Sequence, residues 1–155
     1  MGKSIKRVQA AIDAAGLQTE VQILLESSRT AAHAAAACKC EIGQIAKSMI
    51  FEGQESGKLK LLIVSGAHDV DLGLAKTFVG EALVRADAKR VRSETGFAIG
   101  GVSPIGHLNE IETWMDRALL DYGVVWGAGG APHALFSVSP QDLQRITHAK
   151  VVDLS

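Results

Sequence analysis

The chain has 155 residues, 47% of them hydrophobic and 21% charged, and its formal net charge is −1. These values are typical of one globular domain with a sizeable core. No apolar run approaches the roughly 20 residues that span a bilayer, and a net charge near zero gives no global field to hold long nucleic acid. We therefore expect neither a membrane nor DNA as a partner, and any RNA contact to be confined to a local patch or an end.

The N-terminal residues and the cysteines both bear on the cellular compartment. Residues 3–7 are mostly basic, but no apolar segment follows them, so no secretory signal is visible. Cys38 and Cys40 are the only cysteines, and their spacing matches neither a redox pair nor a zinc framework. The sequence predicts a cytoplasmic protein with two free, buried thiols, no metal and no cofactor.

The first part of the chain predicts two helices and a short strand. Apolar residues at helical spacing place helices over 4–15 and 31–37, and a strand over 20–25 lies between them. Ser4 is the expected N-cap of the first helix, and one of the residues 27–30 is the expected N-cap of the second.

Residues 43–51 predict a strand that carries a lysine among apolar neighbours. Alternation divides its side chains between two faces, with Ile45, Lys47, Met49 and Phe51 on one and Ala46, Ser48 and Ile50 on the other. Such a lysine cannot be buried without compensation. It reaches water, pairs with an acid, or lines a pocket that receives an anion or a carbonyl, and the strand alone does not choose among these.

Short strands and capped helices alternate along the rest of the chain. A polar turn over 52–58 followed by an apolar strand over 59–65 predicts an antiparallel hairpin. Further strands are expected at 82–85, 113–116, 123–127, 134–138 and 151–154, and helices at 72–79, 88–95 and 140–148. This mixture predicts a single α+β domain over 1–155 with a mixed, mainly antiparallel sheet.

Two polar clusters each leave two interpretations open. His68 and Asp69 are either a metal or dyad site or an ordinary turn that caps the next helix, and no third ligand with known spacing follows. Lys89, Arg90 and Arg92 on the 88–95 helix are either a solvated face or a patch that faces RNA.

Residues 95–106, Thr-Gly-Phe-Ala-Ile-Gly-Gly-Val-Ser-Pro-Ile-Gly, contain four glycines and one proline between apolar residues. This composition predicts an ordered loop packed on a core. Gly100 and Gly101 can adopt positive φ, and Pro104 stiffens the end of the loop. Such a loop can aim several N–H groups at one point, as an oxyanion or phosphate site requires, although a purely structural turn is the alternative.

The usual catalytic signatures are missing from the chain. It has no Gly-x-Ser-x-Gly elbow, no P-loop and no His-Glu-x-x-His motif. A lysine and backbone donors remain, which suit hydrolysis of an activated ester better than hydrolysis of an amide.

Three segments, in this order and separation, resemble the YbaK/ProX family: Ile45-Ala46-Lys47-Ser48 with Phe51, Thr95-Gly96-Phe97, and Gly100-Gly101-Val102-Ser103-Pro104-Ile105-Gly106. The resemblance covers nearly the whole chain from about residue 20. Members of this family are free-standing relatives of the editing domain of bacterial prolyl-tRNA synthetases. They hydrolyse mischarged aminoacyl-tRNA in trans, such as Cys-tRNA(Pro) or Ala-tRNA(Pro).

The resemblance implies a barrel-like sheet flanked by helices, and it implies roles for particular residues. Lys47 matches the essential lysine near the acyl ester, and the Gly-x-x-x-Pro loop that orients the carbonyl or the attacking group matches Gly100, Gly101, Val102, Ser103 and Pro104. Candidates for substrate contact are Thr30, Ser48, Met49, Phe51, Ile99, Asp116 and His133, with core packing the alternative for the apolar ones. In cysteine-specific members the thiol of the substrate attacks the ester, whereas alanine requires a positioned water.

The resulting prediction is a metal-free aminoacyl-tRNA deacylase that acts on the acceptor end of mischarged tRNA. The expected substrate is tRNA(Pro) carrying Cys or another small amino acid such as Ala, and prolyl-tRNA synthetase is an expected partner. A non-catalytic module that binds tRNA ends or a synthetase is one alternative, and a small-ligand-binding or regulatory protein is another.

Overall fold

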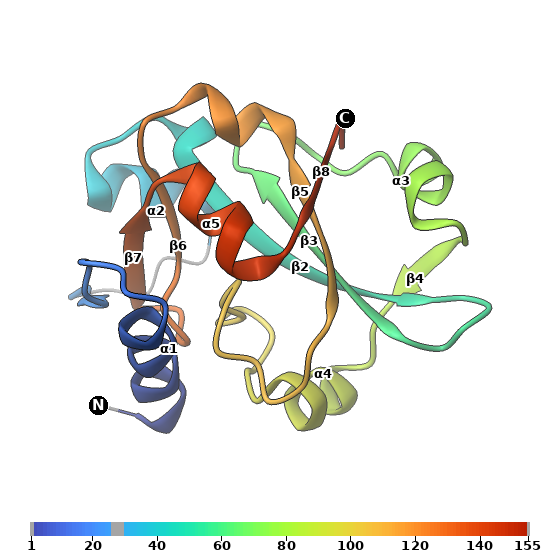
Figure 1. The fold of residues 1–155 in the computed structure, drawn as a ribbon, viewed down its shortest axis with the longest axis horizontal. Helices are drawn as coiled ribbons and strands as arrows, with labels where there is room; N and C mark the ends of the chain where they lie inside the picture. The colour runs from blue at the N-terminus through green and yellow to red at the C-terminus, as the bar shows by residue number, and fades with distance from the viewer. Residues whose placement is uncertain (1, 26–29, 155) are drawn as a thin grey trace.

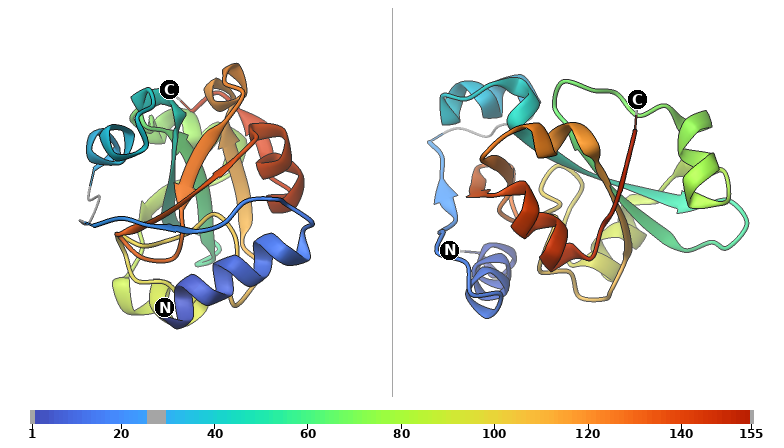
Figure 2. Two further views of the ribbon diagram at one scale, coloured as in Figure 1. Left: turned by 90° about the vertical axis from the view of Figure 1, so that its left-hand side faces the viewer. Right: turned by 45° about the horizontal axis from the view of Figure 1, so that its top comes forward.

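The structure is a computed structural model that describes residues 2–25 and 30–154. A twisted mixed sheet forms its centre, and helices lie around it (Figures 1 and 2). The strands are β1 (Gln22–Ile23), β2 (Ile45–Gly53), β3 (Leu59–Ser65), β4 (Leu83–Arg85), β5 (Glu112–Asp116), β6 (Val125–Ala128), β7 (Ala134–Val138) and β8 (Lys150–Val152). The helices are α1 (Lys3–Ala14), α2 (Ala31–Cys38), α3 (Leu72–Val79), α4 (Ala88–Thr95) and α5 (Pro140–Thr147), with 3-10 turns η1 (Ile42–Gln44) and η2 (Arg117–Asp121).

The sheet runs in the order β1-β7-β6-β2-β3-β5-β8, and β4 pairs with β2 outside this path. The pairs β1–β7, β6–β7, β2–β3 and β2–β4 are antiparallel, whereas β2–β6, β3–β5 and β5–β8 are parallel. The expected α+β fold with a mixed sheet, and the hairpin of β2 and β3, are therefore confirmed. Within the described residues no pairing joins β1 to β8, so the sheet is open rather than a closed barrel.

β2 is paired incompletely along one of its two edges. One edge pairs with β3 along nearly the whole strand. The other edge pairs with β6 at Ile45 and Ala46 and with β4 over residues 51–53. Between these two contacts, residues 47–50 face no described strand and leave a gap beside β2.

The two faces of β2 pack into different parts of the core, as the alternation predicts. Ala46 and Ile50 join the main cluster, which includes Phe97 and residues from α1, α4 and α5. Met49 and Phe51 join a second cluster, around Trp114 and α3. Burial of a large apolar side chain stabilises the fold by roughly 1.5–3 kcal/mol, so the two clusters hold β2 in register from both sides.

Capping residues in the sequence predicted most helix ends correctly. The bounds expected for α3, α4 and β3 are confirmed, and Asp71, Asp87 and Ser139 cap α3, α4 and α5 with their side chains. Thr30 caps α2 by accepting from His33 N, and the other candidate caps, 27–29, lie outside the described residues. No helix in the described part of the chain is long and apolar enough to cross a bilayer.

Two local expectations were wrong. Ser4 is not the N-cap of α1, because Gly2 occupies that position and the Ser4 hydroxyl instead donates to Gly96 O at 3.4 Å. The strand expected over 20–25 shortens to β1, since only Gln22 and Ile23 find partners on β7.

Candidate functional site

A pocket of about 190 Å³ opens beside the gap along β2. Its walls come from α2, β2, β6, β7 and the loop that follows α4: Thr30, Ala31, Ala34, Ile45, Ala46, Lys47, Ser48, Gly100, Val102, Trp126, Ala128, Ala131, Pro132, Ala134 and Leu135. Six of these residues are alanine. The pocket is smaller than the roughly 300–1,000 Å³ of sites for drug-sized ligands, so it suits a small group rather than a whole nucleotide.

Lys47 brings a positive charge to this pocket. Its side chain is half-buried, and its Nζ donates a hydrogen bond to the carbonyl oxygen of His68 at 2.7 Å. No carboxylate among the described residues forms an ion pair with it. An ammonium has three donors, so two remain for a ligand after the bond to His68.

The carbonyl that accepts from Lys47 belongs to a loop that hydrogen bonds to Asp116 hold in place. Asp116 is 2% exposed. Its Oδ2 accepts from Ser65 N at 3.0 Å and lies 2.9 Å from His68 Nδ1, while its Oδ1 accepts from Ala118 N at 3.1 Å. These bonds satisfy both oxygens, so Asp116 positions the loop of His68 and does not line the pocket.

The loop over residues 96–106 forms one side of the pocket. Gly100 and Val102 line it, and their N–H groups donate to no acceptor in the part of the chain that the structure describes. Gly101 N instead donates to Ala98 O at 2.9 Å. A Cβ at Gly101 would lie 2.9 Å from Ala131 Cα, so only glycine lets the loop approach the β6–β7 turn this closely.

The second half of the loop is buried behind the pocket. Ser103 and Pro104 are buried and leave the lining to Gly100 and Val102. His107 Nε2 lies 2.6 Å from Ser103 O, a distance at which the ring must donate. Burial first, and then the charge of Arg7, lower the pKa of His107 to about 4, so at neutral pH the ring is neutral with its proton on Nε2.

Arg7 on α1 joins the two ends of the same loop. Its Nη2 donates to Gly96 O at 2.8 Å and its Nε to Gly106 O at 2.7 Å. The guanidinium also lies over the ring of Phe97, 4.6 Å from its centroid, which is cation–π range. The loop is thus held at both ends by one side chain of α1.

The gap along β2 exposes more unpaired polar groups. Ile45 O accepts from Gly66 N at 2.7 Å, and backbone hydrogen bonds alternate in direction along an antiparallel strand. The N–H and C=O groups of Ser48 and Ile50 therefore face the unpaired edge. The Ser48 hydroxyl is also buried, with no hydrogen-bond partner among the described residues, which costs about 1–3 kcal/mol unless a ligand bonds to it.

The pocket gathers some of the residues predicted for it and omits others. Thr30 lines it, together with Lys47, Ser48, Gly100 and Val102. Met49 and Phe51 lie on the face of β2 that packs against Trp114. Ile99 is 57% exposed at the tip of the loop, and His133 lies in the β6–β7 turn, where its carbonyl accepts from Leu24 N.

No local pattern of residues indicated the apolar wall of the pocket. Ala34, Trp126 and Leu135 lie on α2, β6 and β7 and pack with Ile45 in a third cluster. They meet only because β2 pairs in parallel with β6. The hydrogen-bond partner of His68 could not be predicted from the sequence either, because Asp116 is 48 positions away in the chain whereas Asp69 is adjacent.

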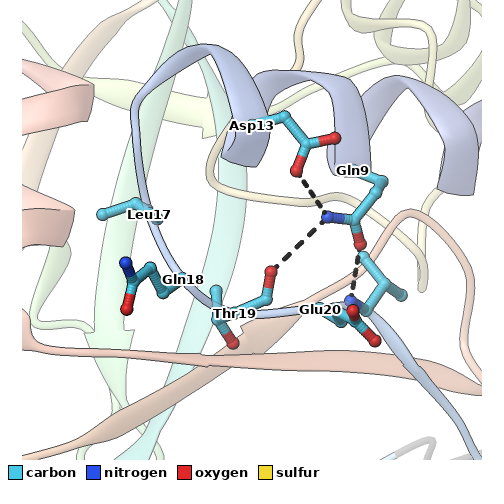
Figure 3. Close-up of a pocket in the computed structure, with 7 residues that line it drawn as sticks. Gln9, Asp13, Leu17, Gln18, Thr19 and Glu20 are labelled. Carbon is cyan, nitrogen blue, oxygen red and sulfur yellow. Dashed lines mark hydrogen bonds between the residues drawn. The ribbon is translucent and has the colours of Figure 1, made fainter.

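A larger hollow of about 700 Å³ lies elsewhere, between α1 and residues 17–21 (Figure 3). The side-chain amide of Gln9 spans it, donating to Asp13 Oδ1 at 3.0 Å and to Thr19 O at 3.4 Å and accepting from Val21 N at 2.9 Å (Figure 3). The amide of Gln9 is thus fully bonded, and the lining of this hollow contains no cation. We therefore do not place the functional site there.

The described residues also bear on metal and thiol chemistry. No group of three or more His, Cys, Asp or Glu that could hold a metal ion occurs in residues 2–25 and 30–154. Cys38 and Cys40 are free and pack against the third cluster. Burial, and then the neighbouring Cys40, raise the pKa of the Cys38 thiol to about 11, so it is not a nucleophile at neutral pH.

Comparisons with known proteins agree with one another. Residues 26–146 match the family model of the aminoacyl-tRNA editing domain. A crystal structure of a candidate trans-editing enzyme for prolyl tRNA synthetase is 45% identical with a TM-score of 0.94, covering 100% of this chain and 98% of that one. The uncharacterised protein YwhH of Bacillus subtilis is 26% identical over 96% of this chain and 94% of its own length. EbsC of Enterococcus faecalis, named as a candidate Cys-tRNA(Pro)/Cys-tRNA(Cys) deacylase, is 22% identical over 74% of this chain and 70% of its own.

Proposed function

Because the chain belongs to the aminoacyl-tRNA editing domain family, we propose that it is a trans-editing deacylase that hydrolyses the ester of mischarged tRNA. The proposed substrate is tRNA(Pro) carrying Cys or another small amino acid such as Ala. Prolyl-tRNA synthetase is the proposed partner, and the proposed domain covers residues 1–155. The names of EbsC and of the solved relative support this assignment.

One observation carries the proposal: a single small pocket is lined by Lys47, by Ser48 and by two loop residues with free N–H groups, Gly100 and Val102. Such donors are what the hydrolysis of an ester needs, because the carbonyl oxygen gains negative charge in the transition state. Each donor that is aimed in advance at this oxygen contributes up to about 10²–10³ in rate.

The reaction requires no nucleophile from the protein. With an alanyl ester, water attacks the ester carbon, the carbonyl oxygen becomes an oxyanion, and the bond to the terminal ribose oxygen then breaks. The ribose oxygen takes the proton that the water loses, which leaves the free amino acid and an uncharged tRNA. In this scheme the ammonium of Lys47 and the N–H groups of Gly100 and Val102 stabilise the oxyanion, and His68 O keeps the ammonium in place.

The size of the pocket supports a small acyl side chain. Its volume is about 190 Å³, and six alanines line it. A hydrophobic pocket discriminates ligands that differ by one methylene by only about 1–3 kcal/mol. We therefore expect graded rather than absolute selection between Ala, Cys and Ser, and slower hydrolysis of the larger prolyl ester.

The test is deacylation of tRNA(Pro) charged separately with Cys, Ala, Ser and Pro. Wild-type protein should release one or more of the small amino acids and spare Pro, and Lys47→Ala should slow the release by roughly 10²–10³-fold. Lys58→Ala is the matched control, because Lys58 is an exposed lysine in the β2–β3 turn and lies outside the pocket.

A non-catalytic module that binds tRNA ends or a synthetase is the second candidate. It is favoured if wild-type protein binds tRNA(Pro) but hydrolyses none of the four esters. Hydrolysis that Lys47→Ala leaves unchanged would contradict the role given to Lys47, even if the protein proves to be a deacylase.

A further inference from the structure

The basic residues of the chain are not spread evenly over its surface. α1 and α4 together carry six basic and two acidic residues, whereas the rest of the chain carries ten basic and fifteen acidic residues. The overall net charge of −1 therefore hides two positive helices on an otherwise negative molecule.

The two acidic residues of these helices bond to neighbouring side chains, whereas four of the basic residues form no ion pair with a described residue. Asp13 accepts from Gln9, and Glu94 forms an ion pair with Arg90. By contrast, no described residue forms an ion pair with the exposed side chains of one set, which we name the basic face: Lys3, Lys6, Lys89 and Arg92. Each helix contributes two of them at i, i+3 spacing. Lys3, Lys6 and Lys89 lie on the side of their helix opposite its buried residues, and Arg92 lies exposed beside the buried side of α4.

Both helices border the loop that lines the pocket. α4 ends at Gly96, where the loop begins, and Arg7 of α1 bonds to both ends of that loop. The start of α1 also lies against the β6–β7 turn, since a Cβ at Gly130 would lie 2.8 Å from the backbone of Ser4. The next residue, Ala131, lines the pocket. α1 and α4 lie along the same margin of the molecule in two views at right angles (Figures 1 and 2).

We infer that the basic face is the docking surface for the duplex stem of the RNA whose aminoacyl end enters the pocket. This inference rests on the proposed function. Free lysines and arginines on two helices contact phosphates without reading bases, and an A-form RNA stem is recognised mainly through its shape and backbone. The pocket is too small to hold more than the end of such a substrate, so most of the affinity must come from a surface outside it.

The test compares two esters of the same amino acid: intact charged tRNA, and an aminoacylated CCA trinucleotide that lacks the stem. The variant is the double reversal Lys6→Glu/Lys89→Glu. The matched control is Lys58→Glu/Lys76→Glu, which changes the net charge equally at two exposed lysines outside the basic face. A second double variant, Lys3→Glu/Arg92→Glu, provides the same test if the first does not fold. Circular dichroism verifies the fold of each variant.

We expect the basic-face variants to lower the preference for intact tRNA over the trinucleotide, as the ratio of kcat/KM values, by roughly tenfold or more. The slope of log kcat/KM against log salt for intact tRNA should become shallower by about two, one for each lost phosphate contact. The control pair should keep the ratio and the slope of the wild type. An unchanged ratio in both basic-face variants, or an equal loss in the control, would overturn the inference and leave the deacylase assignment standing.

Binding measurements keep the two proposals distinguishable if wild-type protein hydrolyses neither ester. In that case the deacylase assignment fails, and the basic face is tested by the affinity for uncharged tRNA. Loss of this affinity in the basic-face variants, with the control unaffected, supports the inference. Unchanged tRNA affinity, together with charge-dependent binding to phosphatidylserine vesicles, would assign the face to a membrane surface and overturn the inference.

Discussion

The two hollows of the molecule differ in what their polar groups do. In the larger one, beside α1, the side-chain amide of Gln9 is bonded to three neighbours. In the smaller one, the hydroxyl of Ser48 has no partner among residues 2–25 and 30–154, and the N–H groups of Gly100 and Val102 donate to no acceptor there. A ligand gains hydrogen bonds only where those of the protein are unmet. Unmet hydrogen-bonding capacity, rather than volume, therefore identifies the candidate site.

The largest difference between the hollows should appear in activity. Lys47→Ala should slow deacylation by roughly 10²–10³-fold, because it removes a charge aimed at the developing oxyanion. Gln9→Ala, at the centre of the larger hollow, should keep most of the wild-type rate. Single-turnover kinetics on a charged tRNA measures both. A comparable loss in the two variants would remove the distinction between the hollows.

The loop behind the pocket should make stability depend on pH. The pKa of His107 falls from 6.5 to about 4 on folding, so between these values the unfolded chain binds a proton that the folded protein does not. Stability is then complete above pH 6.5 and decreases as pH falls towards 4, by about 3 kcal/mol in all. Urea denaturation at several pH values measures this slope. His107→Gln should flatten it, and a slope that survives the substitution would assign it to other groups.

Asp116 should affect both stability and rate, by a smaller amount. Asp116→Asn weakens the buried bonds to Ser65, His68 and Ala118 and should lower the free energy of unfolding by about 2 kcal/mol, as expected for hydrogen bonds to a charged group. Deacylation should also slow, but less than in Lys47→Ala, because Asp116 acts only through His68 O. Asp69→Asn, at an exposed neighbour of His68, is the control for both thermal denaturation and activity. If Asp69→Asn had the larger effect, the pairing of His68 with Asp116 would be contradicted.

The smallest expected effect is a change in the free energy of unfolding, and its sign differs between the two hollows. Ser48→Ala removes a buried hydroxyl without a partner and should raise the free energy of unfolding by up to about 1 kcal/mol while it slows deacylation. Gln9→Ala removes satisfied hydrogen bonds and should lower it by about 1 kcal/mol. Chemical denaturation of the two variants in parallel measures the difference. A destabilised Ser48→Ala would mean that the hydroxyl is bonded in the folded protein.

Much of the fold was predictable because its signals are local. Aspartate caps and a following glycine set both ends of α3 and α4, where Asp71 and Asp87 bond to the first turn and Gly80 and Gly96 adopt positive φ. The apolar composition of β3 predicted a buried strand, and β3 is paired on both sides. The failure at Ser4 is also instructive, because its hydroxyl has a tertiary partner, Gly96 O, which local spacing cannot reveal.

The sequence by itself determined which residues could do chemistry, and the tertiary structure decided which of them meet. Lys47 among apolar neighbours and the glycine-rich loop were visible from residue type and spacing, since both features lie within one short segment. The packing of the two faces of β2 into different clusters, the bond between His68 and Asp116, and the apolar wall of Trp126 and Leu135 all depend on pairings between distant strands. Periodicity cannot specify such pairings, because strand order and register arise only when the whole core packs.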